Sequence, residues 1–356
     1  MVALLCLVGL MVLPAAAAPA APTAPTAPSV LVLGDSYASG EGLPSAEGVC
    51  GTEAALSWPA LVAQHLQSTH VRLLACSGAT VTDVTVGGPL GREPQLAAAA
   101  AGGPADLVLL TIGGNDLGFT DIVGDCLGFA GLDEAPSVEA LEGASWSDLV
   151  GRGEIDRGCD VSQAELLDRV TDLAASDRFV VDSEGGTGGL AALHASVVEQ
   201  AVAEGGRLVV VGYPALFAEV ARWADRYGQR CHGLGAADAE ALGRVVVALD
   251  EEVAAEVAAA NVLLGADVVE YVSVLAVYDG SADGEDHRLC GGGTPWLNGL
   301  TVAEGGIDVA RLLVQLGAGA DGLDLEALGA RPGGSFHPST AGHRGTAAAV
   351  LDALGD

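Results

Sequence analysis

Short apolar runs recur at wide intervals along the chain, and this recurrence constrains the fold more than any other feature. Each run is rich in valine and leucine and has the length of a buried strand, and helix-length segments separate the runs. This alternation predicts a parallel sheet covered by helices on both faces, a three-layer α/β/α sandwich. The expected strands are residues 30–33, 71–75, 107–112, 208–212 and 268–274.

The first run ends in Gly34-Asp35-Ser36, which suits a turn from a strand into a helix. A serine at such a turn lies at the carboxyl edge of the sheet, where ligands bind, and beside backbone N–H groups that favour negative charge. Ser36 is therefore a candidate nucleophile. Asp and Ser also cap helices, so this segment alone supports a capping role equally well.

Two later runs are followed by segments with groups suited to binding an oxyanion. Gly78 follows the second run, allows close approach of the backbone and leaves an N–H free for a ligand. Asn115 follows the third run after two glycines and can donate from its amide without needing a charge. Each segment alone is explained equally well as a plain turn.

A histidine near the C-terminus is a candidate general base. His337 precedes Pro338, which restrains the chain, and Ser339, which suits the cap of a final helix at 339–354. His337 is thus expected on a rigid loop, as a general base requires. His343 falls inside that helix, where a structural role is the better interpretation.

The charge of the chain excludes some partners. It has 356 residues, 50% of them hydrophobic, enough for one large α/β domain. There are 47 acidic residues against 15 basic ones, all arginine, and the formal net charge is -32. Nucleic acid is therefore excluded as a partner, and an anionic membrane surface would repel the protein.

The chain divides into three parts. Residues 1–18 are apolar and end in alanines, which indicates a signal peptide, although no basic residue precedes them. Residues 19–28 repeat Ala-Pro-Thr and predict an extended linker. Residues 29–356 form the folded domain, with helices expected at 57–67 and 236–264 and a helical insertion at about 118–188. No stable membrane span is expected.

Six cysteines lie outside the expected signal peptide. An even number in an exported chain indicates disulfides, and six cysteines allow 15 pairings. Pairing between neighbours in sequence is preferred because each bridge then closes one loop excursion from the sheet. The preferred pairs are Cys50 with Cys76, Cys126 with Cys159, and Cys231 with Cys290. No C-x-x-C motif is present, so zinc and thioredoxin-type sites have little support.

The four segments together resemble the GDSL, or SGNH, family of serine hydrolases, whose second name records a Ser, Gly, Asn and His from four blocks. The matching residues follow the family's order over residues 29–356: Ser36, Gly78, Asn115 and His337. The resemblance implies a flavodoxin-like arrangement of a mostly parallel five-stranded sheet. It implies that Ser36 attacks an ester carbonyl and that His337 takes the serine proton. The oxyanion would be held by the Ser36 and Gly78 backbone N–H groups and by Asn115.

The sequence departs from the family's commoner pattern at one position. Many members carry an aspartate three residues before the histidine, and here that residue is Gly334. Some members use a main-chain carbonyl to hold the imidazole instead. We therefore expect a Ser/His dyad in which the Gly334 carbonyl orients His337. An Asp or Glu oxygen within about 3.2 Å of the distal histidine nitrogen would restore an ordinary triad.

The six cysteines and residues 294–299 look more narrowly like the secreted bacterial lipase and esterase branch, in which three disulfides pair sequentially. The resemblance predicts a secreted, extracellular, monomeric hydrolase of acyl or lipid esters that uses no metal or organic cofactor. Its activity should fall as acid protonates His337, at about pH 6 for an ordinary pKa. The alternatives are a carbohydrate-acetyl esterase of the same fold and a non-catalytic secreted binding protein.

Two weaker signals have more than one interpretation. Residues 279–285 begin like a calcium loop, but Cys290 occupies the position of the bidentate Glu, so a solvated acidic loop is preferred. Tyr37, Phe119 and Trp296 could line a substrate pocket or simply fill the core. Trp58 is expected to pack inside the protein.

Overall fold

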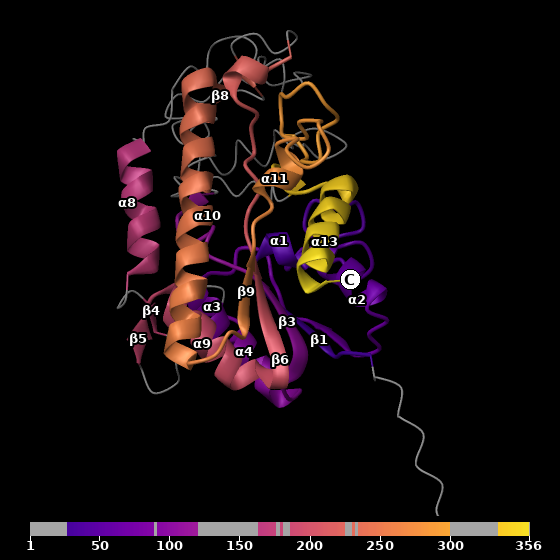
Figure 1. Ribbon diagram of the computed structural model, residues 1–356, viewed down its shortest axis with the longest axis vertical. Helices are drawn as coiled ribbons and strands as arrows, with labels where there is room; N and C mark the ends of the chain where they lie inside the picture. Colours follow the sequence, from indigo (N-terminus) through magenta and orange to yellow (C-terminus); the bar gives the residue numbers. More distant parts are fainter. Residues whose placement is uncertain are drawn as a thin grey trace, which may run out of the picture.

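The computed structural model describes residues 27–88, 91–119, 163–175, 179–180, 186–224, 230–231, 234–299 and 334–355. The expected signal peptide and most of the expected linker lie outside these residues, as does most of the first half of the segment 118–188. Within the described part, helices surround a central five-stranded sheet (Figure 1).

All five strands expected from the sequence are present and pair in parallel, which confirms the predicted α/β fold. Their order across the sheet is β2-β1-β3-β6-β9. β6 begins earlier than expected. The sequence pattern missed its first half because those residues are intermediate or exposed and lack the apolar run that marks the buried second half. The strands are β1 (Val30–Gly34), β2 (Val71–Leu73), β3 (Ala105–Thr111), β6 (Val202–Val211) and β9 (Val269–Val272).

Helices cover both faces of the sheet, so the molecule has three layers (Figure 1). α2 (Trp58–His65) and α13 (Thr340–Leu354) pack together on one face. α9 (Leu190–Ala201) and α10 (Ala236–Leu264) pack together on the other. The remaining helices are α1 (Ser36–Ser39), α3 (Val81–Thr85), α4 (Gln95–Ala101), α8 (Gln163–Ala174), α11 (Leu275–Tyr278) and the 3₁₀ helix η1 (Val220–Arg222). Two small hairpins complete the structure: β4 (Phe179–Val180) with β5 (Thr187–Gly188), and β7 (Arg230–Cys231) with β8 (Leu234–Gly235).

The sequence pattern explains the longest helix. α10 matches the range expected from the sequence, and its buried residues recur at helical spacing, among them Leu242, Val246, Leu249 and Val253. Gly265 ends the helix at φ +65°, a conformation that glycine adopts without a steric penalty. The buried stripe packs inside the protein, and Glu240 and Glu251 are exposed, while Asp250 faces β9 and accepts a hydrogen bond from Tyr271.

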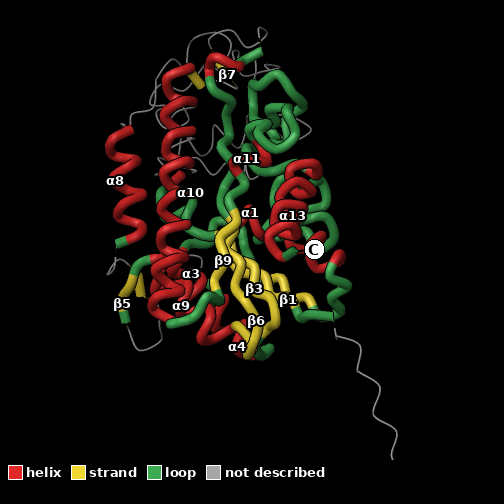
Figure 2. The backbone as a smooth tube through the Cα atoms, viewed as in Figure 1, coloured by secondary structure: helices red, strands yellow, loops and turns green. Residues whose placement is uncertain are grey.

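The register of β1 and β3 places their carboxyl ends side by side, since Gly34 pairs with Thr111. The first crossover leads from β1 to β2 on one side, and β3 lies on the other. The crevice between the ends of β1 and β3 is therefore the topological switch point, where open α/β sheets bind ligands. Figure 2 shows the loops that gather above this edge of the sheet.

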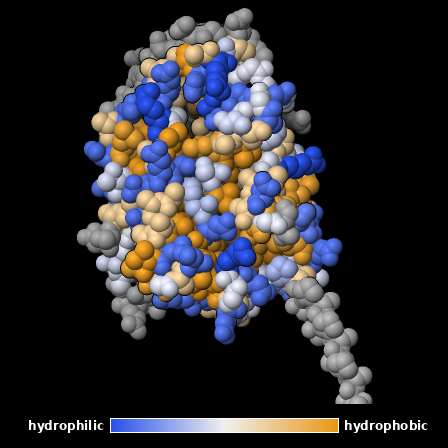
Figure 3. Space-filling model, viewed as in Figure 1, coloured by the Kyte–Doolittle hydropathy of each residue, from blue (hydrophilic) through white to orange (hydrophobic). Residues whose placement is uncertain are grey.

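The surface mixes polar and apolar residues on the face shown in Figure 3. Few large apolar side chains are strongly exposed, and two of them, Val262 and Leu263, are neighbours at the end of α10. In the part of the chain that the structure describes, no helix has both the length and the apolar character needed to cross a bilayer.

Candidate active site

Ser36 is the first residue of α1 and follows the carboxyl end of β1. The turn needs a glycine before it: Gly34 has φ +119°, and a Cβ there would lie 2.0 Å from the Thr111 carbonyl oxygen. Asp35 caps α1 by accepting a hydrogen bond of 3.0 Å from the Tyr37 N–H. The turn therefore contains both features weighed from the sequence, a cap at Asp35 and a serine at the edge of the sheet.

Ser36 and His337 form a hydrogen bond although 301 positions separate them in the sequence. Nε2 of His337 lies 2.8 Å from Oγ of Ser36, and Nδ1 lies 2.9 Å from the carbonyl oxygen of Ser335. A carbonyl can only accept, so Nδ1 carries the proton and Nε2 is free to accept from the serine hydroxyl. This tautomer allows Nε2 to take a proton from Ser36.

The carbonyl that holds the imidazole belongs to Ser335, so the expectation of Gly334 was wrong by one residue. Phe336 has φ +61°, a conformation uncommon for a residue with a side chain, and the chain turns there between Ser335 and His337. The carbonyl of Ser335 thereby faces the ring two residues later. Among the described residues, the hydrogen-bond partner of Nδ1 is this carbonyl and not an Asp or Glu oxygen.

Electrostatics at His337 combine two opposing effects. Burial lowers the pKa of His337, while the nearby negative charge of Glu41 and the Ser335 carbonyl oppose this shift. Glu41 follows α1 and was not recognised from the sequence, because only the fold places it near a residue so distant along the chain. The net effect favours the neutral imidazole, the form that can act as a base.

Gly78 and Asn115, the two expected oxyanion donors, lie in neighbouring loops. Nδ2 of Asn115 donates to the carbonyl of Ala79 over 2.9 Å, which joins the loop after β3 to the loop after β2. Gly78 is exposed with φ +75°, and a Cβ there would meet no atom within 4 Å. The structure thus brings all four sequence blocks to one edge of the sheet, with open space over Gly78.

Tyr213 connects two of these blocks and was not predicted from the sequence. It lies just after β6, accepts a 3.0 Å hydrogen bond from the Gly114 N–H and donates to Oδ2 of Asp35. Burial raises the pKa of Asp35 to about 7, and the bond from Tyr213 opposes this rise. Tyr213 thereby fixes the turn that carries Asn115 relative to the turn that carries Ser36.

Tyr213→Phe is expected to lower kcat by about tenfold, because the loss of one hydroxyl frees the Gly114 turn and leaves buried polar groups unpaired. The free energy of unfolding should also fall by about 1–3 kcal/mol. Steady-state kinetics on a p-nitrophenyl ester and urea unfolding measure the two effects.

Tyr271→Phe is the matched control, because Tyr271 also donates to a carboxylate, that of Asp250 over 2.6 Å, but from β9 and outside the site. It should lose comparable stability and keep its kcat. An equal loss of kcat in both variants would assign Tyr213 a purely structural role.

Asn298 holds the histidine loop in place. Its N–H donates to the carbonyl of His337 over 2.9 Å, and its carbonyl accepts from the N–H of Phe336 over 3.0 Å. Its side chain donates to the carbonyl of Gly42, which follows α1 (2.8 Å). This residue lies in the segment 294–299 that the sequence singled out, and it joins the serine and histidine segments.

The aromatic residues noted in the sequence lie around this assembly. The Tyr37 ring is 4.8 Å from the His337 ring, and its hydroxyl donates to the Phe336 carbonyl over 2.8 Å. The Trp296 ring stacks on the His287 ring. Trp58 is buried, as expected. Its backbone N–H donates a hydrogen bond to Nδ1 of His343, so His343 joins α13 to α2. Burial lowers the pKa of His343 to about 3.

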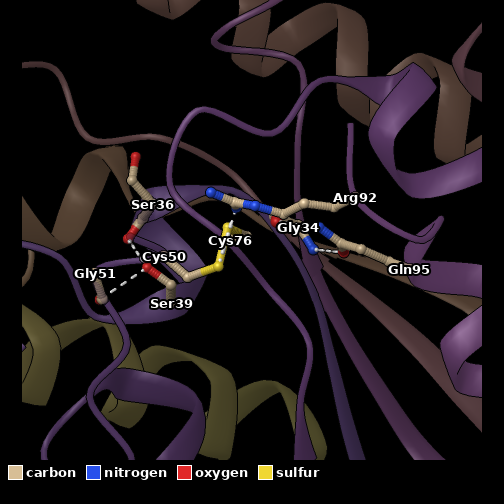
Figure 4. Close-up of a disulfide and its surroundings, with 8 residues drawn as sticks. All are labelled: Gly34, Ser36, Ser39, Cys50, Gly51, Cys76, Arg92 and Gln95. Atoms are coloured by element: carbon tan, nitrogen blue, oxygen red, sulfur yellow. Dashed lines mark hydrogen bonds between the residues drawn. A yellow bond between two sulfur atoms is a disulfide. The ribbon is translucent and has the colours of Figure 1, made fainter. Parts of the chain in front are cut away.

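Two disulfides are described, and both have the expected partners. Cys50–Cys76 ties the loop after α1 to the loop that carries Gly78 (Figure 4), and Cys231–Cys290 joins β7 to the segment before Trp296. Cys126 and Cys159 lie outside the described residues. Among the described residues, no cluster of His, Cys, Asp or Glu is suited to a metal, and Asp283 of the acidic loop bonds to Nε2 of His287 over 2.7 Å.

The chain is similar to a known family and to a curated protein. Residues 32–256 match the profile of the GDSL-like Lipase/Acylhydrolase family. A lipase from Streptomyces rimosus is 40% identical over 98 residues, which is 27% of this chain and 33% of that lipase. The chain thus matches about a third of the length of this relative.

Two solved structures share the fold. The extracellular lipase from Streptomyces rimosus has a TM-score of 0.51 and 22% identity, over 91% of this chain and 98% of that one. The phospholipase A1 from Streptomyces albidoflavus NA297 has a TM-score of 0.50 and 24% identity, over 92% of this chain and 99% of that one. At this level of identity, the likeness establishes the fold.

Proposed function

Because the chain belongs to the GDSL-like lipase/acylhydrolase family of carboxylic ester hydrolases, we propose that it is a secreted enzyme that cleaves acyl or lipid esters through an acyl-enzyme on Ser36. The observation that carries the proposal is the 2.8 Å hydrogen bond between Oγ of Ser36 and Nε2 of His337. The Ser335 carbonyl fixes the proton of His337 on Nδ1, so Nε2 can accept the serine proton. The similarity to a Streptomyces lipase favours acyl or lipid esters as substrates.

In the proposed mechanism, Oγ of Ser36 attacks the ester carbonyl while Nε2 of His337 takes the serine proton. The oxyanion is stabilised by the backbone N–H groups of Ser36 and Gly78 and by the amide of Asn115. His337 then protonates the leaving alcohol. Water attacks the acyl-enzyme with His337 again as base and releases the carboxylic acid.

The proposal includes the processing and location of the chain. Residues 1–18 would serve as a signal peptide and 19–28 as a linker, with 118–188 inserted in the hydrolase domain. Disulfides persist in oxidising compartments, so Cys50–Cys76 and Cys231–Cys290 support export. We propose that Cys126 and Cys159 form a third pair.

The experiment that tests this function is hydrolysis of p-nitrophenyl esters of increasing acyl length, combined with labelling by a fluorophosphonate probe. Purified protein should release p-nitrophenol, and mass spectrometry should find the probe on the peptide that contains Ser36. Activity on the acetyl ester alone would point to a carbohydrate-acetyl esterase. No turnover on any ester and no labelled serine would leave a binding protein as the better explanation.

The pH profile gives a further prediction. Only neutral His337 accepts a proton, so kcat/KM falls as the pH drops through the pKa of His337. Because burial holds this pKa below 6.5, half of the activity should be lost only below pH 6.5. Removing the charge at residue 41 lowers the pKa further, so Glu41→Gln should move the acid limb to still lower pH. If the acid limb of the Glu41→Gln profile moved to higher pH, the assignment of His337 as the base that Glu41 influences would be contradicted.

A further inference from the structure

Arg92 lies at the same edge of the sheet as the nucleophile. It precedes α4, which leads into the amino end of β3 and therefore begins near the carboxyl edge. Three residues later, Gln95 holds both backbone groups of Gly34: its Oε1 accepts from the Gly34 N–H (2.7 Å) and its Nε2 donates to the Gly34 carbonyl (2.8 Å). Gly34 is two residues before Ser36, so this segment is anchored to the nucleophile turn.

The guanidinium of Arg92 reaches across a disulfide toward this turn. Its Nη1 lies 3.0 Å from Sγ of Cys50, which is bonded to Cys76, two residues before Gly78. Figure 4 shows the side chain of Arg92 extended over the disulfide toward Ser36. The cation therefore lies against the disulfide that joins the loop after α1 to the loop that carries Gly78.

No carboxylate among the described residues forms an ion pair with Arg92. Its guanidinium donates to a disulfide sulfur, a weak acceptor, and among the described residues its other N–H groups have no hydrogen-bond partner. This is notable in a chain of net charge -32, where acidic partners are abundant. Other arginines have such partners: Arg169, Arg207, Arg222, Arg244 and Arg288 each form an ion pair. The side chain of Arg92 is half-exposed and accessible to a ligand.

We propose that Arg92 forms an anion subsite that binds a phosphate group on the alcohol part of the ester substrate. This inference rests on the proposed ester hydrolysis at Ser36. The planar guanidinium presents paired N–H donors that match two phosphate oxygens, and it stays charged throughout the working pH range. The protein has a net charge of -32 and otherwise repels anions, so Arg92 supplies the local positive charge that binds the phosphate and selects against the uncharged analogue.

The test compares two substrates that differ only by the phosphate, dihexanoylglycerol and dihexanoylglycerol 3-phosphate. In Arg92→Gln, the ratio of kcat/KM for the phosphate ester to that for the uncharged ester should fall by about 10- to 100-fold, the effect of one charge-assisted interaction. Arg92→Lys keeps the positive charge but lacks the paired N–H donors of the guanidinium, so it should give an intermediate ratio. Arg207→Gln, an exposed arginine on β6 paired with Glu270, is the control and should leave the ratio unchanged.

Several outcomes would overturn the proposal. An unchanged ratio in Arg92→Gln, or an equal loss on both substrates, would assign Arg92 to support of the disulfide. The protein could instead bind inorganic phosphate through Arg92 and show no preference between the two esters. That result would mean that the subsite takes free phosphate and not the phosphate of the substrate.

A second measurement does not depend on turnover. Calorimetric binding of the phosphate ester to Ser36→Ala, with and without Arg92→Gln, tests the subsite even if the proposed hydrolysis fails. Binding that weakens when Arg92 is replaced supports the subsite, and binding that stays the same contradicts it.

Discussion

Ser36→Ala is expected to lower kcat/KM for p-nitrophenyl butyrate by about 10⁴- to 10⁶-fold. The methyl group cannot form the acyl-enzyme, so only binding and the oxyanion donors remain to assist attack by water. The fold should survive, because the hydrogen bond recorded for the Ser36 hydroxyl is the one to His337. Steady-state kinetics and thermal unfolding of the two proteins measure both effects.

Ser281→Ala is a suitable control for this variant, because Ser281 is exposed in the acidic loop at 279–285. It should match the wild type in activity and in melting temperature. If Ser36→Ala kept more than about a hundredth of the wild-type activity while folded, catalysis through an acyl-enzyme on Ser36 would be wrong.

His337→Ala is expected to cost about 10⁴-fold or more in kcat, because the serine hydroxyl then has no base to receive its proton. The cavity left by the ring lies next to Ser36 and Tyr37, so added imidazole can enter it and should restore part of the activity. Rate measurements with increasing imidazole check this result.

The control for this variant is His65→Ala, an exposed histidine at the end of α2. Its activity should equal that of the wild type, with no response to imidazole. If His337→Ala kept near-normal turnover, the base would have to be another residue. A loss of activity that imidazole does not restore, together with a lowered melting temperature, would indicate damage to the loop.

Much of the fold was predictable because its signals are local. The apolar runs and the period of α10 depend on residues close together in the chain, and the structure places them as expected. The same holds for the start of α13, where the Ser339 side chain accepts from the Gly342 N–H over 3.5 Å.

The partners of the site residues were less predictable. The Ser335 carbonyl replaces that of Gly334 because of a positive φ at Phe336, which has no sequence signal. Tyr213 bonds to Asp35 across 178 positions, and nothing near Tyr213 in the sequence marks it for this role. Arg92 could be read from the sequence only as one of 15 basic residues.

The sequence alone determined the order of strands and helices and the four segments that bear Ser36, Gly78, Asn115 and His337. It could do so because hydrophobic period, caps and turn glycines act within a few residues. The tertiary structure decided which carbonyl holds the imidazole, which tyrosine joins the nucleophile and amide turns, and where Arg92 lies relative to the Cys50–Cys76 disulfide. These contacts join segments distant in the chain, and their geometry exists only once the sheet brings the ends of its strands to one edge.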